Sequence, residues 1–194
     1  MYHIKADKRS LQSSEMIFEA LVQLVKEKSY QELTVTEIVQ RAKLGRATFY
    51  RNFDVIDDIL QWKCDKAYHG LYQYIVESYQ TPGFLSSNDQ FMLLKPSLRY
   101  WYVNSFIIEL LIHVGRIEII DRSYARMLDQ LTPHFHKSHE TIWKHLDYFV
   151  AIRRGVTVSL LVQWIKNDKN IPPDELADLI IAQFNESLHL KLRF

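Results

Sequence analysis

Apolar residues recur at helical spacing along most of the 194-residue chain, and this pattern predicts an all-α fold. Near the start, apolar positions three and four apart predict an amphipathic helix from about Ser10 to Lys28. A shorter stripe predicts a second helix from Val35 to Lys43. A third short helix is expected from Arg46 to Phe53, with Phe49 and Phe53 facing inward. The chain contains only five Gly and five Pro, which disfavours a β architecture with frequent tight turns.

Polar residues mark where several of these helices begin. Thr34 and Glu37 have the spacing of a capping box, in which each side chain bonds the backbone N–H of the other residue. Asp54 is the expected N-cap of a fourth, long helix that reaches about Tyr79. Residues 57–58, both Asp, lie in its first turn, where the helix dipole favours negative charge.

A break at residues 81–83 (Thr-Pro-Gly) separates the fourth helix from a second run of helical pattern. Further helices are predicted at about 88–102, 105–114, 117–136, 140–168 and 174–190. The start of the last of these helices is indicated by Pro172-Pro173 followed by two acidic residues. We predict two domains, residues 1–60 with a helix-turn-helix and residues 61–194 for effector binding and dimerisation, with the fourth helix linking them.

Composition indicates a globular protein of the cytoplasm. The apolar fraction is 47% and the charged fraction 24%, which excludes wholesale disorder. The single cysteine, Cys64, excludes an intramolecular disulfide framework, and no apolar run approaches the length of a membrane span. The net charge is only +1, but residues 38–53 contain four basic side chains and no acidic one. This local concentration of charge favours a phosphate-bearing partner.

The second and third helices, joined by a short turn, have the layout of a helix-turn-helix motif, whose second helix enters the DNA major groove. Arg46 suits a bidentate contact with guanine, Ala47 permits close approach, and Tyr50 offers a hydroxyl to phosphate. By itself the pattern also fits an ordinary pair of packed helices. The predicted DNA-binding residues are Thr34, Thr36, Lys43, Gly45, Arg46, Ala47, Thr48, Tyr50, Arg51 and Asn52.

The stretch from Leu33 to Phe53, with Asp-Asp-Ile-Leu at 57–60, resembles the DNA-binding segment of tetracycline-repressor-type (TetR/AcrR) regulators. Residues 47–53 (Ala-Thr-Phe-Tyr-Arg-Asn-Phe) are its most specific part, and the resemblance covers about residues 10–62. Family members usually have Gly where this chain has Lys43, so Lys43 is expected to tolerate a left-handed or strained backbone. Many also have Lys where this chain has Val-Ile-Asp at 55–57. Its absence should weaken DNA binding or shift the phosphate contacts to Lys5, Lys8, Arg9, Arg41 and Lys43.

A weaker resemblance covers the end of the chain and implies a homodimer. It rests on Phe149, Gly155, Leu160, Trp164-Ile165, Asn167 and residues 173–176. In the family, the last two helices pair with their copies in a second subunit as a four-helix bundle. The residues predicted for dimerisation are Val156, Leu160, Trp164, Leu176, Ile180 and Phe184. These apolar faces would also fit packing within one subunit, because periodicity does not identify what a face packs against.

The resemblance implies an effector pocket among the central helices. The predicted lining is Tyr100, Trp101, Phe106, Leu110, His113, Met127, Phe149 and Arg153, although aromatic stripes are also ordinary core material. No metal site is predicted; His134, His136 and His139 form the only candidate cluster, and polar histidines are equally common in loops.

Together these patterns predict a dimeric, sequence-specific transcriptional regulator that binds a pseudo-palindromic double-stranded DNA operator. A repressor released by an unidentified small-molecule effector is the mode that the resemblance implies. No enzymatic motif is present, and no cofactor and no membrane association are expected. The alternative is a protein of this fold that acts through a protein partner, with weak or no DNA binding. A helical carrier or enzyme is a third hypothesis.

Overall fold

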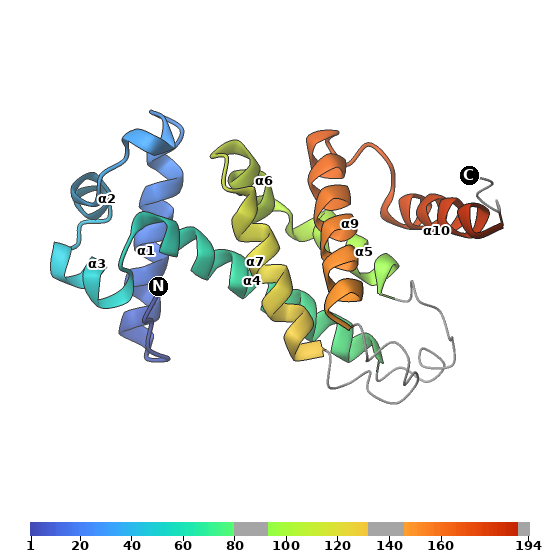
Figure 1. Cartoon of the computed structure of the whole chain (residues 1–194). Helices are drawn as coiled ribbons and strands as arrows, with labels where there is room; N and C mark the ends of the chain where they lie inside the picture. Colours follow the sequence, from blue (N-terminus) through green and yellow to red (C-terminus); the bar gives the residue numbers. More distant parts are fainter. Residues whose placement is uncertain (80–92, 132–145, 190–194) are drawn as a thin grey trace.

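The computed structural model describes residues 1–79, 93–131 and 146–189, and within these ranges it contains helices and no strand (Figure 1). The predicted all-α fold class is therefore confirmed. The helices are α1 (Lys8–Leu24), η1 (Tyr30–Glu32), α2 (Val35–Arg41), α3 (Arg46–Asn52), α4 (Ile56–Tyr79), α5 (Leu94–Asn104), α6 (Phe106–His113), α7 (Ile117–Leu131), α9 (Leu146–Lys166) and α10 (Pro173–His189). None of these helices is long and apolar enough to cross a membrane.

Helix α1 supports the helix pair α2 and α3 at one end of the molecule (Figure 1). It begins two residues before its predicted start because the carboxylate of Asp7 accepts from the N–H of Ser10 at 2.8 Å. Its buried stripe includes Ile17, Phe18 and Leu21. These apolar positions recur every three or four residues, so one face of the helix is removed from water.

The capping box predicted at the start of α2 is confirmed. The hydroxyl of Thr34 accepts from the N–H of Glu37 at 3.3 Å, and the carboxylate of Glu37 accepts from the N–H of Thr34 at 3.0 Å. The ammonium of Lys28 also bonds Glu37, at 2.5 Å. These contacts lower the pKa of Glu37 to about 2, the Lys28 hydrogen bond first and the Thr34 hydrogen bonds next.

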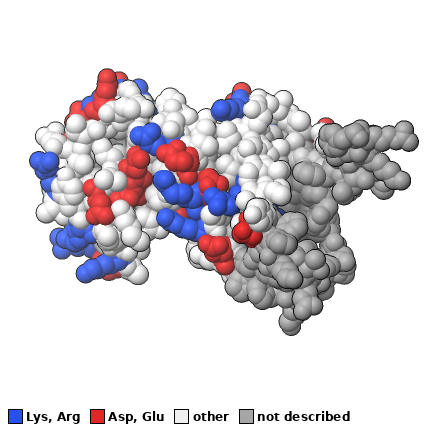
Figure 2. Space-filling model, viewed as in Figure 1, with Lys and Arg blue, Asp and Glu red and all other residues white. Residues whose placement is uncertain are grey.

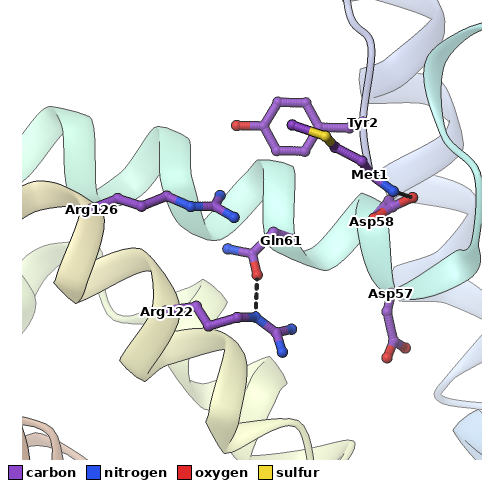
Figure 3. A pocket seen from close by; sticks show the side chains of 7 residues that line it. All are labelled: Met1, Tyr2, Asp57, Asp58, Gln61, Arg122 and Arg126. Atoms are coloured by element: carbon purple, nitrogen blue, oxygen red, sulfur yellow. Dashed lines mark hydrogen bonds and ion pairs between the residues drawn. The ribbon is translucent and has the colours of Figure 1, made fainter.

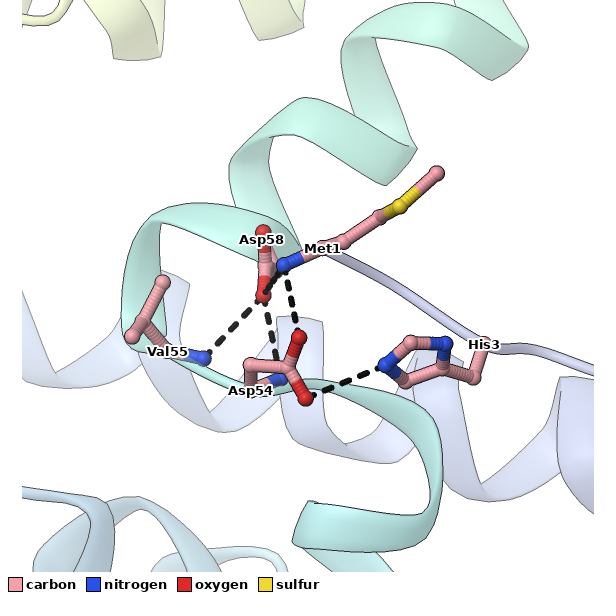
Figure 4. A network of polar contacts seen from close by, with 5 residues as sticks. All are labelled: Met1, His3, Asp54, Val55 and Asp58. Atoms are coloured by element: carbon pink, nitrogen blue, oxygen red, sulfur yellow. Dashed lines mark hydrogen bonds and ion pairs between the residues drawn. The ribbon is translucent and has the colours of Figure 1, made fainter.

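The start of α4 differs from the prediction that Asp54 is its N-cap. The carboxylate of Asp58 accepts from the N–H groups of Asp54 at 3.0 Å and Val55 at 3.1 Å (Figure 4). The carboxylate of Asp54 instead accepts from the amino group of Met1 at 2.9 Å and contacts His3 at 3.0 Å. The amino group of Met1 also bonds Asp58, at 2.8 Å, so both carboxylates hold the N-terminal segment, and Asp58 in addition holds the backbone just before α4.

Helix α4 runs from the N-terminal helices into the rest of the molecule, where it packs against α5, α6 and α7 (Figure 1). Aromatic rings fill this contact: Tyr68 of α4 lies 4.9 Å from Trp101 and 5.9 Å from Tyr124, measured between ring centroids. Helix α9 packs on α6 and α7, whereas α10 extends away from α9 and packs on α5. An ion pair between Arg99 and Asp174 joins α5 to the start of α10.

Candidate nucleic-acid interface

The turn between α2 and α3 has a defined backbone geometry. Lys43 has φ 54°, in the left-handed region, as expected from its place where the family has Gly. The N–H of Leu44 donates to the carbonyl of Val39 at 2.8 Å, and the N–H of Lys43 donates to the carbonyl of Gln40 at 3.1 Å. This is the Schellman pattern, which ends a helix abruptly. It lets α3 begin after only four residues, with Gly45 as its N-cap.

The inner face of α3 is anchored by aromatic packing. Phe49 and Phe53 are both fully buried, with ring centroids 5.8 Å apart, as the apolar pattern predicted. Phe53 also packs against Trp62 of α4 at 6.0 Å. Because aromatic side chains bury large surfaces in defined geometries, these contacts hold α3 in one orientation relative to α1 and α4.

Asn52 is placed differently from the prediction that it contacts DNA. Its side chain is fully buried. Its amide oxygen accepts from the hydroxyl of Ser10 at 2.9 Å, and its amide nitrogen donates to the hydroxyl of Ser13 at 3.0 Å. The amide is thus used in tying the end of α3 to α1, and it is not available to a base or a phosphate.

The outer face of α3 carries the exposed residues of the motif. Arg46, Ala47, Tyr50 and Arg51 are all exposed, Tyr50 to 50% despite its large ring. Among the described residues, neither arginine forms an ion pair or a side-chain hydrogen bond. Lys43, in the turn before α3, is exposed in the same way. Helix α3 and the turn before it therefore present three cations, Lys43, Arg46 and Arg51, and the described part of the chain provides no acidic partner for them.

The remaining predicted contacts are placed at the edge of this face. Thr36 and Thr48 are partly exposed. Thr34 is exposed, but its hydroxyl already takes part in the capping box and donates to Glu37 at 2.7 Å. Gly45 is exposed, and nothing lies within 4 Å of the position that its Cβ would have. A close approach of a DNA backbone at this turn therefore meets no side chain.

The basic residues expected to take over phosphate contacts divide into two groups. Lys5, Lys8 and Arg9 are exposed at the start of the chain. Arg41 instead forms a two-pronged pair with Glu27, with both N–O distances 2.8 Å, and the hydrogen bond lowers the pKa of Glu27. Figure 2 shows basic side chains at the outer end of the N-terminal helices, and acidic and basic side chains mixed toward the middle of the molecule. The charge pattern favours a polyanion at the outer end.

Residues 17–61, which contain this helix-turn-helix, match the sequence profile described as bacterial regulatory proteins, tetR family. The match is confined to this segment of the chain. This match supports a role in transcriptional regulation. A sequence comparison with curated proteins gives no significant match.

The whole fold of this chain is similar to solved structures of low sequence identity. The crystal structure of Lin0861 from Listeria innocua aligns over 94% of each chain with a TM-score of 0.72 and 13% identity. The fatty acid degradation regulator FadR from Bacillus halodurans aligns over 87% of this chain and 92% of its own, with a TM-score of 0.50 and 15% identity. These likenesses extend the fold assignment from the N-terminal domain to the remaining helices.

Among the predicted effector residues whose side chains the structure describes, His113 alone lines either of the two cavities reported below. Trp101, Leu110 and Met127 are buried in the core, whereas Phe106, His113 and Arg153 are exposed and Tyr100 is partly buried. The side chain of Phe149 lies outside the described residues, as do His134, His136 and His139. Tyr100 and Trp101 pack on each other at 5.2 Å, so this aromatic stretch acts as core material.

Two cavities lie elsewhere, at the boundary between the N-terminal helices and α7. One, of about 500 Å³, is lined by Met1, Tyr2, Asp57, Asp58, Gln61, Arg122 and Arg126 (Figure 3). The other, of about 490 Å³, lies between residues 25–31 and 113–115, and includes His113. In the first, the guanidinium Nε of Arg122 donates to the side-chain oxygen of Gln61 at 2.9 Å. The sequence analysis missed this polar boundary; its one local signal is the pair Gln61 and Asp65, four residues apart on α4.

The residues predicted for dimerisation also divide. Trp164 and Leu176 are buried within the chain, and the indole N–H of Trp164 donates to the carbonyl of Ile171 at 2.9 Å. Leu160 and Ile180 are partly buried, Val156 is exposed, and the side chain of Phe184 lies outside the described residues. The alternative of packing within one subunit therefore applies to Trp164 and Leu176.

Proposed function

We propose that this chain is a dimeric, sequence-specific DNA-binding transcriptional regulator, which acts as a repressor released by a small-molecule effector. The observation that supports it most directly is the outer face of α3, where Arg46, Tyr50 and Arg51 are exposed on a helix held rigidly from behind. Arg reads guanine through two parallel hydrogen bonds, and a rigid helix keeps that geometry. The family match of residues 17–61 supports the same function.

A homodimer is the proposed assembly, because α9 has apolar side chains that the described part of the chain leaves exposed. Tyr148, Ile152 and Val156 are exposed and lie four residues apart, so they share one face of α9. Two copies of such a face, related by a twofold axis, would cover each other. The two recognition helices would then address half-sites about one helical turn, roughly 34–36 Å, apart.

The rival proposal, a partner protein in place of DNA, has one observation in its favour. Tyr50 and Val55 are exposed apolar side chains on the N-terminal domain, and Arg41 is already neutralised by Glu27. Exposed aromatic residues are enriched in protein interfaces. The three exposed cations near Tyr50 favour DNA over a protein partner. The phosphates of DNA attract these cations even while the side chains stay in contact with water.

The experiment that tests the proposal is DNA binding across a salt series, with DNA that flanks the chain's own gene. Wild-type protein should bind specifically and lose affinity steeply as salt rises, because bound phosphates release counterions. Arg46→Ala should lower specific affinity by about 1–3 kcal/mol, and Tyr50→Phe should weaken binding less.

Lys26→Ala is the matched control, since Lys26 is a free cation of the same domain that faces the 113–115 turn instead of the α3 surface. Its affinity should stay near the wild-type value. A folded dimer that binds no DNA at low salt would contradict direct recognition of that DNA and favour the partner-protein alternative.

A further inference from the structure

Three residues from separate parts of the chain meet between the N-terminal helices and α7. Tyr30 lies in η1, Asp57 in the first turn of α4, and Arg116 between α6 and α7. The hydroxyl of Tyr30 donates to Asp57 at 2.5 Å, and Nε of Arg116 donates to the same carboxylate at 3.3 Å. The guanidinium of Arg116 also lies 5.0 Å from the centroid of the Tyr30 ring. We call these three residues the clasp.

The backbone fixes Arg116 in place. Gly115 has φ 71°, a left-handed conformation that a residue without Cβ adopts at no steric cost. The N–H of Arg116 donates to the carbonyl of Leu111 at 2.8 Å, which completes a Schellman turn at the end of α6. The turn therefore determines where the Arg116 side chain begins, and only the side chain is left to orient.

The other two members are also constrained. Tyr30 is 7% exposed, and burial, followed by the hydrogen bond to Asp57, raises its pKa well above the ordinary value. The phenol thus keeps its proton and remains a donor at any physiological pH. Asp57 lies at the N-terminal end of α4, where the helix dipole favours a carboxylate. Its carboxylate accepts from the DNA-binding helices on one side and from the α6–α7 turn on the other.

Resting on the proposed function, we infer that the clasp is a positioning site that sets the angle of the DNA-binding helices relative to α7, and so the half-site spacing the dimer accepts. Apolar packing alone resists separation of two surfaces but resists sliding weakly, because it is not directional. Hydrogen bonds to a shared carboxylate are directional and charge-assisted. None of the three residues is on the α3 face, so the clasp acts through orientation rather than through DNA contact.

The first measurement needs no DNA. Spin labels are attached to Glu19→Cys on α1 and Gln130→Cys on α7, both exposed positions. Cys64 is buried and its pKa is raised to about 12 by burial, so it stays unlabelled. The distance distribution between the labels should broaden in Arg116→Ala and in Tyr30→Phe. Because both changes act through Asp57, the double variant should broaden it little more than either single variant.

The second measurement uses a duplex selected by the wild-type protein from a random-sequence library, resynthesised with its half-sites moved by one and two base pairs either way. Arg116→Ala should bind the original spacing about 2- to 5-fold more weakly, the upper range for a partly exposed ion pair. Its preference for that spacing over the altered ones should shrink. A merely stabilising contact would lower every affinity by the same factor.

Arg99→Ala is the control, because Arg99 forms another Arg–Asp pair, more exposed than that of Arg116, with Asp174 at the far end of the molecule. The inference is overturned if both clasp variants match Arg99→Ala in label distances and in spacing preference. Failure to select any duplex would contradict the proposed function, while the label distances would still decide whether the clasp sets the angle. Tyr30→Phe retains the buried ring, so it tests the clasp should Arg116→Ala fold poorly.

Discussion

The hydroxyl of Tyr100 lies against Gly70, in the space that a Cβ at position 70 would need, and donates to the carbonyl of Ala67 at 2.8 Å. Helices α4 and α5 approach closely at this point because Gly70 has no side chain. A glycine inside a helix lowers its stability by roughly 0.5–1 kcal/mol relative to alanine, so its presence here reflects the contact with Tyr100.

We therefore predict that Gly70→Ala destabilises the protein by about 1–2 kcal/mol, because the overpacked phenol must move and lose its hydrogen bond. Tyr100→Phe removes the clashing oxygen. The double variant Gly70→Ala/Tyr100→Phe should be more stable than Gly70→Ala alone, as measured by urea unfolding. Additive losses in the double variant would show that the hydroxyl is not the cause.

Asn52 and Arg51 are neighbours in the sequence but should respond differently to substitution. Asn52→Ala removes one buried hydrogen bond from each of the hydroxyls of Ser10 and Ser13, and should lower the free energy of unfolding by about 1–3 kcal/mol. Arg51→Ala removes an exposed cation, and should change stability by less than about 0.5 kcal/mol while weakening DNA binding. Equal stability of the two variants would contradict the assigned role of Asn52.

Lys43 combines an unfavourable backbone with a favourable charge. Replacement of Lys43 by Gly should stabilise the fold by about 1 kcal/mol, because φ 54° strains a residue with a Cβ. The same change removes a cation beside α3, so DNA affinity should fall and its salt dependence should become shallower. Lys43→Asn serves as the second variant, because Asn tolerates the left-handed region better than most residues. Unchanged salt dependence in both would remove Lys43 from the DNA contacts.

The capping box gives α2 a pH-dependent contribution. The pKa of Glu37 is lowered from its ordinary value of 4.5 to about 2 in the folded state. A lowered folded-state pKa means that the contribution is complete above about pH 4.5 and disappears as the pH falls toward 2. Wild type should therefore be more stable than Glu37→Gln at pH 6.5, and the difference should shrink between pH 4.5 and 3. A constant difference across this range would contradict the ionised cap.

The dimer proposal makes a local prediction on α9. Ile152→Glu places a charge on the exposed apolar face and should shift the protein from dimer to monomer in analytical ultracentrifugation, because an unpaired charge is costly to bury. Val103→Glu is the control, since Val103 is an exposed apolar residue on α5. Dissociation by Val103→Glu and not by Ile152→Glu would place the interface elsewhere.

Local patterns predicted much of the motif from the sequence. The capping box of Thr34 and Glu37 and the inward Phe49 and Phe53 depend on residues within a few positions of one another, whereas the backbone of Lys43 was expected from the family resemblance. Propensity and spacing act over that range, so these features follow from the sequence alone.

The errors concern contacts between distant parts of the chain. The spacing of apolar residues led us to predict that Asn52 is exposed. In the structure it is buried, because it bonds Ser10 and Ser13, about forty positions earlier. The carboxylate of Asp54 bonds Met1, more than fifty positions earlier, and Asp58 bonds both Met1 and the backbone before α4, which local spacing did not indicate. Trp164 has the apolar character of an interface residue, and its hydrogen-bond partner in the following loop was not visible in the periodicity.

Helix α4 comprises 24 residues and reaches from the DNA-binding helices deep into the remaining ones. At about 1.5 Å per residue it is a rod of roughly 36 Å, and a tilt of about 5° at one end moves the other by about 3 Å. Successive base pairs are separated by about 3.4 Å along the DNA axis. A small rotation of α4, with the packing around Tyr68 kept, therefore displaces the DNA-binding helices by nearly one base-pair step. Helix α4 thus acts as a lever that magnifies slight rearrangements near α7.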